Sequence, residues 1–207
     1  YYSPVAMSIK KMIESLPPCP NRRGLLVAIE GPCCSGKTHL IDKVKDLLGG
    51  PEEVTVLNYN MHDHYHIIKL LKKGICVIIE NYILDDMVDD MHTSDHYQVM
   101  PTRKGFKSIL KEYKRNTIVA DLTIYLEPDT STLVNRLIAK EIIKTEDEYI
   151  FSLIRRRNEF LSKLAHSGII ENVVCMTHDP ITKETDALNL ITMRAAMEMY
   201  DRPIKIY

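Results

Sequence analysis

The stretch GLLVAIEGPCCSGKTHLIDKVKDLL, residues 24–48, decides the fold. Residues 25–29 form a continuous apolar run, which is typical of a parallel strand that is buried on both faces. The end of the stretch repeats apolar residues at helical spacing, at Leu40, Ile41, Val44, Leu47 and Leu48. Gly49 and Gly50 follow, and glycine tolerates the left-handed conformation in which many helices end. The stretch therefore predicts a strand, a glycine-bearing turn and a helix.

The turn matches a phosphate-binding motif, because residues 31–38 (GPCCSGKT) fit the pattern G-x-x-x-x-G-K-[ST]. Gly31 and Gly36 let the backbone curl until its N–H groups point inward and cradle phosphate oxygens. Lys37 adds a positive charge on the outer phosphates, and the hydroxyl of Thr38 can ligate magnesium. The start of the helix adds its dipole. We predict a nucleoside triphosphate site made of Gly31, Cys34, Ser35, Gly36, Lys37, Thr38 and His39.

Composition limits the number of domains, the partners and the compartment that we expect for the protein. At 207 residues and 45% apolar content, the chain can bury one full core. The formal net charge of −1 gives no basic field for nucleic acid, and the apolar runs are too short to cross a bilayer. The first residues lack the pattern of a signal peptide, and the five scattered cysteines indicate reduced thiols. We expect a cytoplasmic protein that binds neither nucleic acid nor membranes.

The elements after residue 50 alternate between strands and helices. Strands are predicted at 54–59, 75–80, 121–127 and 171–177, and helices near 66–74, 104–115, 129–140, 148–165 and 183–200. This order predicts a parallel sheet with helices on both faces, which binds ligands at the carboxyl ends of its strands. Residues 81–103 are polar with few periodic signals, so no element is predicted there. We expect an N-terminal extension over 1–23, with a short helix at 4–16, and one domain over 24–207.

An acid ends the strongly apolar strand at 75–80. Glu80 would face the phosphate turn, where it could ligate magnesium or accept a proton from the attacking oxygen. The alternative is an acid that only caps a helix or faces solvent. Nearby Asp85, Asp86, Asp89 and Asp90 are interpreted mainly as a solvated face, with Asp85 or Asp86 as a lesser candidate for the metal.

Basic residues gather further along the chain. Arg136, Lys140, Lys144 and Arg155–Arg157 could form a mobile cover that stabilises charge on a transferred phosphoryl group and excludes water. Arginine suits this role because it can bond two oxygens at once. We predict catalytic roles for Arg136, Arg155 and Arg157, against the alternative of solvated helix faces. Arg103 is predicted to clamp a phosphate or base of the acceptor, with Tyr82 also in the substrate site.

The order of these motifs resembles the thymidylate kinase and deoxynucleoside kinase superfamily of P-loop kinases, over about residues 24–200. The segments that carry the resemblance are IEGPCCSGKT (29–38), KGICVIIENY (73–82), DLTIYLEPDTSTLVNRL (121–137) and EDEYIFSLIRRRNEFLSKLA (146–165). The resemblance implies a three-layer α/β/α fold with a five-stranded parallel sheet and a helical lid at about 137–148. It also implies ATP with Mg²⁺, transfer of the γ-phosphate to a nucleoside or nucleoside monophosphate, and a homodimer.

By position, the resemblance assigns Lys37 and Thr38 to ATP and magnesium, Glu80 to the catalytic and metal-binding acid, and Arg136 to the first lid arginine. Two features depart from the family. Asn81 stands where the family has arginine, and the segment before the Glu80 strand is short. Three interpretations therefore stay open: a monophosphate kinase with thymidylate as the leading acceptor, a kinase for a nucleoside or another small hydroxyl compound, and a catalytically weak nucleotide-binding protein.

Overall fold

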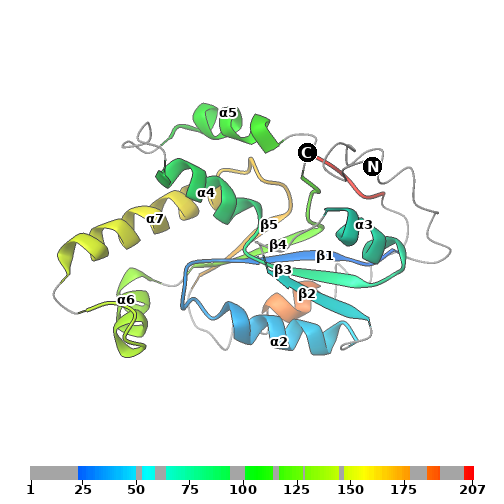
Figure 1. Ribbon diagram of the computed structural model, residues 1–207, viewed down its shortest axis with the longest axis horizontal. Coiled ribbons are helices and arrows are strands. Elements are labelled where there is room, and N and C mark those ends of the chain that lie inside the picture. Colours follow the sequence, from blue (N-terminus) through cyan, green and yellow to red (C-terminus); the bar gives the residue numbers. More distant parts are fainter. Residues whose placement is uncertain are drawn as a thin grey trace, which may run out of the picture.

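The protein is a parallel sheet with helices on both faces (Figure 1). This computed structural model describes residues 23–49, 53–58, 64–93, 101–113, 117–127, 129–144, 147–177, 186–191 and 203–207. The strands in these ranges are β1 (Leu26–Glu30), β2 (Val54–Asn58), β3 (Cys76–Glu80), β4 (Leu122–Glu127) and β5 (Val173–Thr177). All pair in parallel, in the order β2-β3-β1-β4-β5. The predicted five-stranded parallel sheet is confirmed.

Helices connect the strands as predicted, with one addition. They are α2 (Lys37–Leu47), α3 (His64–Lys72), α4 (Ile83–Thr93), α5 (Arg103–Tyr113), α6 (Thr130–Ala139) and α7 (Glu148–His166). Residues 186–191 are also helical. The bounds differ from the predicted ones by a few residues at most, apart from α4. The predicted helix at 4–16, and most of the one at 183–200, lie outside the described residues.

Helix α4 corrects the expectation that residues 81–103 hold no element. Its apolar residues recur at helical spacing and are all buried: Ile83, Leu84, Met87, Val88 and Met91. Pairs of aspartates separate them, and these make the segment polar on average. The polar average of the segment concealed the helical spacing of its apolar residues. The interpretation that residues 81–103 lack periodicity was therefore wrong for residues 83–93.

The alternating residues of β1 enter two different cores. Leu26 and Ala28 pack with α3, α4, α5 and α7 on one face, and Val27 and Ile29 pack with α2 and residues 187 and 191 on the other. In Figure 1, α2 lies below the sheet, and α3, α4 and α5 lie above it. Because both faces of β1 are covered, its run of apolar residues is continuous and not alternating.

The end of β1 lies where the sheet topology reverses. The chain forms β2 and β3 on one side of β1 and β4 and β5 on the other. In register, Ile29 lies beside Glu80 of β3, and Glu30 lies beside Tyr125 of β4. In open parallel sheets, ligands bind at such a switch point, outside the carboxyl ends of the strands. The loop that leaves β1 is therefore the expected ligand site.

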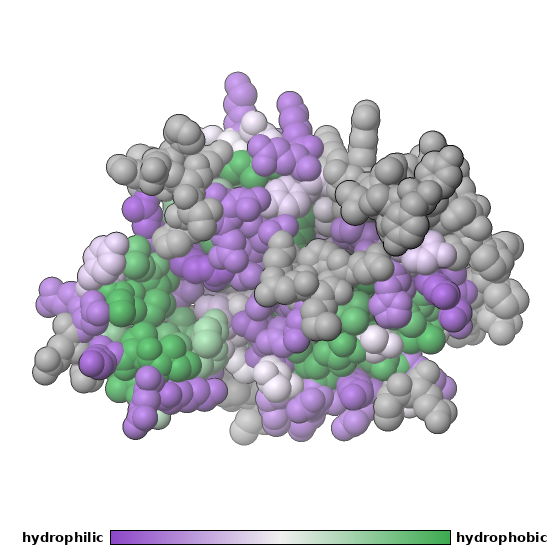
Figure 2. Space-filling view, in the orientation of Figure 1, coloured by the Kyte–Doolittle hydropathy of each residue, from purple (hydrophilic) through white to green (hydrophobic). Residues whose placement is uncertain are grey.

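Helices α6 and α7 form an apolar unit of their own beside this loop. Leu133, Leu137 and Ile143 are buried in a cluster separate from the two main cores, and Cys34 of the loop packs against it. Figure 2 shows hydrophobic side chains gathered over this end of the molecule, and Ile142 is 54% exposed there. None of the helices in the described ranges is both long and apolar enough to span a bilayer.

Candidate phosphate-binding active site

The loop between β1 and α2 has the backbone of a phosphate cradle. Gly36 adopts a left-handed conformation with φ 95°, and no side chain caps the start of α2 behind it. A Cβ at Gly31 would lie 2.7 Å from the carbonyl oxygen of Leu126, so this position also requires glycine. Ser35 Oγ is buried without a hydrogen-bond partner among the described residues. The uncapped N–H groups and this hydroxyl leave hydrogen-bonding capacity for an anion.

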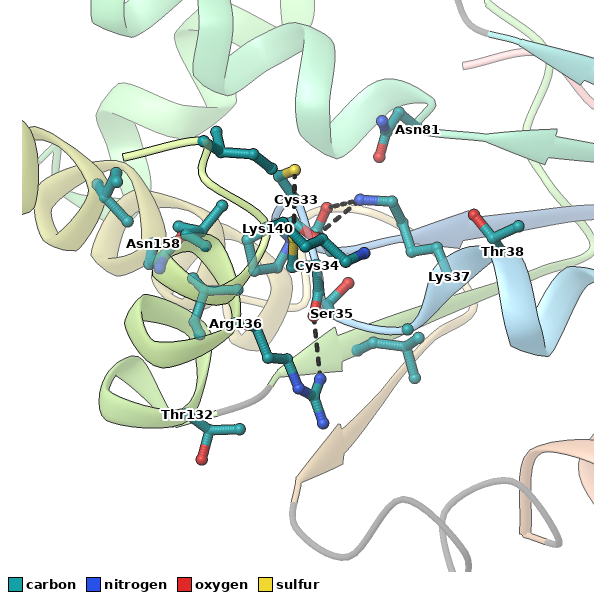
Figure 3. Close-up of a pocket in the computed structure, with 18 of the residues that line it drawn as sticks. Cys33, Cys34, Ser35, Lys37, Thr38, Asn81, Thr132, Arg136, Lys140 and Asn158 are labelled. Carbon is teal, nitrogen blue, oxygen red and sulfur yellow. Dashed lines mark hydrogen bonds between the residues drawn. The ribbon is translucent and has the colours of Figure 1, made fainter. Parts of the chain in front are cut away.

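Lys37 lies folded over this loop. Its Nζ donates to the carbonyl oxygens of Gly31 at 2.5 Å and Pro32 at 2.9 Å, and its side chain is buried (Figure 3). Burial lowers the pKa of Lys37, while the charges of Glu80 and Asp85 oppose that shift. The ammonium group is thus held among oxygen atoms at the point where a triphosphate would arrive.

Arg136 of α6 reaches the other side of the loop. Its Nη1 donates to the backbone carbonyl of Cys34 at 2.9 Å, across 102 residues of sequence. Cys34 has φ 66°, a conformation that is uncommon for a residue with a side chain. Arg136 therefore lies at the loop and lines the pocket, and the same contact supports the shape of the loop.

The junction of β3 and α4 faces the loop from the β3 side. Glu80 and Asn81 line the pocket, and Figure 3 places Asn81 apart from the α6 residues Thr132 and Arg136. Asn81 has φ 57°, and Asn tolerates this left-handed conformation better than Arg does. Its amide oxygen is buried without a hydrogen-bond partner among the described residues. The backbone conformation at this position therefore suits Asn better than Arg.

Glu30, at the end of β1, stabilises the junction of β3 and α4. Its carboxylate accepts hydrogen bonds from the backbone N–H groups of Tyr82 at 2.7 Å, Leu84 at 3.1 Å and Asp85 at 2.9 Å. A residue of β1 thus caps the start of α4, where the helix dipole favours negative charge. Burial raises the pKa of Glu30 to about 7, and the three N–H groups oppose the shift. Sequence reasoning missed this role, because the two segments lie 52 to 55 residues apart.

Arg157 of α7 also lines the pocket, but two carboxylates hold it. Its Nη2 lies 2.5 Å from Asp85 Oδ1 and 2.8 Å from Asp89 Oδ1, both on α4. Asp85 was interpreted mainly as part of a solvated face, and the structure instead places it in the pocket, paired with this arginine. Asp89 was also interpreted mainly as part of a solvated face, and its side chain is 53% exposed, although it pairs with Arg157.

Three predicted site residues do not line the pocket. Tyr82 is buried in the core, and its hydroxyl donates to the carbonyl oxygen of Ile118. Arg103 is exposed at the start of α5, and Arg155 is exposed on α7. Two residues along a helix correspond to a rotation of about 200°, so Arg155 faces away when Arg157 faces the pocket. The structure brings the other predicted residues together around the loop.

The pocket also contains residues that sequence reasoning did not single out. Asp129 and Thr132 come from the start of α6, and Asn158 follows Arg157 on α7. The spacing of Ile154, Arg157 and Asn158 (i, i+3, i+4) marks one helix face, so periodicity could have found Asn158. Lys140, named only as one of several basic residues, lines the pocket as well.

The cavity has about 1370 Å³, more than one drug-sized ligand fills, so it has room for a donor and an acceptor together. Thr38, Glu80 and Asp85 offer it oxygen atoms, the ligands that Mg²⁺ prefers. Among the described residues, no group of three or more His, Cys, Asp or Glu could hold a metal ion. The residues present fit an ion that phosphate oxygens help to bind, and not a site built from protein ligands alone.

Comparison with known proteins identifies the fold. No family model matches the chain, and no curated protein matches it. Among solved structures, the thymidylate kinase of Candida albicans superposes with a TM-score of 0.58 at 16% identity, covering 89% of this chain and 98% of that one. Deoxyadenosine kinase of M. mycoides with bound dATP gives 0.52 at 15% identity, covering 81% of this chain and all of that chain.

A third structure points the same way. The YorR protein of Bacillus subtilis, in complex with phosphorylated GDP, gives a TM-score of 0.52 at 18% identity, covering 86% of this chain and 99% of that one. The chain therefore has the α/β fold of the P-loop nucleotide kinases. At these identities the likeness concerns the fold and not the substrate.

Proposed function

We propose that the protein transfers the γ-phosphate of ATP to a hydroxyl or phosphate of a small acceptor of the nucleoside or nucleoside monophosphate class. The single observation that carries the proposal is the loop between β1 and α2, with Lys37 folded over it and Arg136 bonded to it. Phosphoryl transfer needs mainly positioning and charge stabilisation, and this arrangement supplies both.

We assign roles from the contacts. Lys37 would exchange its two carbonyl partners for phosphate oxygens, and Arg136 and Arg157 would stabilise charge on the transferred group. Thr38 and Glu80 would hold Mg²⁺, which neutralises phosphate charge when bound. We also propose that segment 137–148 closes over the nucleotide, since Lys140 and Ile143 already line the pocket. The alternative role for Glu80 is to accept the proton of the attacking oxygen.

The next question is whether the acceptor is a nucleoside or a nucleoside monophosphate. Thymidylate is the acceptor implied by the resemblance, and a monophosphate needs a cation on the side of the pocket at Glu80. Asn81 offers a neutral amide there, Arg103 does not line the pocket, and Arg157 is paired with two aspartates. These observations favour a second candidate, an uncharged nucleoside, which needs no cation at this side of the pocket.

A panel assay tests the proposal. The protein is incubated with ATP, Mg²⁺ and each of a set of nucleosides and their monophosphates, and ADP formation is measured above the rate without acceptor. Lys37→Ala is the control, and it should lower the rate by about 100-fold or more because it removes the positive charge that would bind the phosphates. ATP binding without transfer to any acceptor would favour a nucleotide-binding protein, and normal turnover in well-folded Lys37→Ala would refute the assignment of the site.

A further inference from the structure

Two cysteines in the phosphate loop carry thiols that the proposed function does not use. The sulfur atoms of Cys33 and Cys34 lie 3.7 Å apart, in van der Waals contact. Cys33 is exposed, Cys34 is partly buried, and both line the pocket. The hydrogen bond from Arg136 to the carbonyl of Cys34 holds the backbone of the pair. The two thiols are therefore presented together, on a supported loop, at the place where a triphosphate would bind.

The separation suits a single atom that binds both sulfurs. At a bond length of about 2.3 Å, such an atom holds two sulfurs about 3.3 to 3.8 Å apart, for angles between about 90° and 109°. The observed 3.7 Å lies inside this range. Little movement of the loop is needed to form two bonds to one thiophilic centre.

The ligands around the pair indicate which kind of atom can bind there. Lys37 and Lys140 act on Cys33, and Arg136 is bonded to the same loop. A divalent ion such as Zn²⁺ would need further ligands beside two thiolates, and the described residues hold no group of three or more His, Cys, Asp or Glu that could supply them. Trivalent arsenic that carries one organic group forms a neutral product with two thiols and needs no other protein ligand. The surroundings therefore favour the arsenical over a metal ion.

We propose that Cys33 and Cys34 form a dithiol binding site for trivalent organoarsenicals, and that its occupation closes the phosphate cradle. With phenylarsine oxide, two arsenic–sulfur bonds form and the arsenic–oxygen bond breaks. The two thiol protons leave with that oxygen as water, and arsenic stays trivalent, so no oxidant or reductant is needed. The bound group would project from Cys33 into the pocket and exclude the phosphates.

The chemistry of single thiols sharpens the prediction. Partial burial, together with the neighbouring Cys34 thiol, raises the pKa of Cys33, which favours the thiol over the more reactive thiolate and slows simple alkylating agents. A reagent that bonds to two thiols reacts faster when the two thiols are already close together. We expect phenylarsine oxide to modify the protein at least 10-fold faster than iodoacetamide modifies Cys33 at the same concentration.

Intact mass spectrometry tests the site without any reliance on kinase activity. The wild type should take up one phenylarsenic group that 2,3-dimercaptopropanol removes and that 2-mercaptoethanol, at equal thiol concentration, leaves in place. Cys33→Ser, Cys34→Ser and the double variant should lose this stable adduct, and Cys175→Ser, which removes a cysteine outside the pocket, should keep it. An equally stable adduct on the double variant would overturn the proposal.

Nucleotide binding tests the second half. A fluorescent ATP analogue should bind the modified wild type at least 10-fold more weakly, and 2,3-dimercaptopropanol should restore binding. If the adduct forms and the analogue binds unchanged, the dithiol does not close the cradle. If neither modified nor unmodified protein binds the analogue while the adduct forms, the dithiol site stands and the proposed nucleotide function fails.

Discussion

Glu30 shows how one buried residue positions several others. It accepts three backbone hydrogen bonds at the start of α4, and Glu80, Asn81 and Asp85 lie at that same junction. Between about pH 4.5 and 7, the folded protein keeps the proton of Glu30, whose pKa is raised to about 7, while the unfolded chain releases it. Stability therefore falls as pH rises through this window, by up to about 3 kcal/mol, and is level above it.

Urea unfolding of the wild type and Glu30→Gln at pH 5 and pH 7.5 measures this effect. Gln does not titrate, so the variant should lack the contribution, and the stability of the wild type relative to the variant should fall between the two pH values. The loss of one acceptor lowers the stability of the variant equally at both. If the difference between the two proteins does not change with pH, Glu30 does not titrate in this range.

Glu80 is the second residue whose role can be measured. Glu80→Gln keeps the shape of the side chain and removes its charge beside the phosphates. We expect kcat to fall by about 100-fold or more, because the charge of Glu80 would act in the transition state. The binding of ATP should change little. The unfolding midpoint of the variant controls for stability, since Glu80 ends a strand and is only partly buried. Activity within a few-fold of the wild type would make Glu80 a strand-end acid only.

At the scale of elements, α4 and α7 meet through Arg157 and two aspartates. Asp89 is about half exposed and does not line the pocket, so it can be changed without touching the site directly. An exposed pair of this kind contributes up to about 1 kcal/mol, or about a five-fold effect on binding. Asp89→Asn removes one of the two carboxylates that hold Arg157, which leaves its charge more available to an acceptor phosphate. We therefore predict that the variant lowers KM for a nucleoside monophosphate by about that factor and leaves KM for the nucleoside unchanged.

Glu159→Gln is the matched control for this prediction. It makes the same change of charge on α7, two residues from Arg157, at an exposed position. An equal effect of both variants on the monophosphate would reflect only the overall charge, and the pairing would then not govern the choice of acceptor.

The same helices show what the sequence could and could not predict. The strand before the loop, the loop itself and α2 follow from residues 24–48, because their signals are local. Helix α4 was missed because its aspartates masked the spacing of Met87, Val88 and Met91. Tyr82 was expected in the substrate site, but a position after a strand does not reveal which face a side chain takes, and the structure buries it.

At the scale of the whole molecule, an ion pair holds the strands together at the end of the sheet opposite the site, where β1 and β4 begin. Arg23 donates two hydrogen bonds to Asp121, at 2.7 and 2.8 Å, and Asp121 also accepts from the backbone of Leu26. Both side chains are about nine-tenths buried. This pair joins the beginnings of β1 and β4, and nothing in the sequence pattern linked two residues 98 positions apart.

Asp121→Ala should therefore destabilise the protein by about 3 kcal/mol, because it removes the buried carboxylate that balances the charge of Arg23. Substrate binding should be unchanged in the folded fraction, since the pair is remote from the pocket. Glu171→Ala, which breaks an exposed pair with Lys205, should cost about 0.5 kcal/mol or less. Similar losses in the two variants, measured by urea unfolding, would show that burial does not set the strength of the Arg23 pair.

The small cluster of Leu133, Leu137 and Ile143 has a consequence for how the molecule opens. It is separate from both main cores, so α6 can detach without disturbing the sheet. Amide hydrogens of α6 should then exchange with deuterium through a local opening, at a lower free energy than those of β1. A ligand that bridges Arg136 and the loop would slow this exchange. Protection of α6 equal to that of β1 in the free protein would mean that both belong to one cooperative unit.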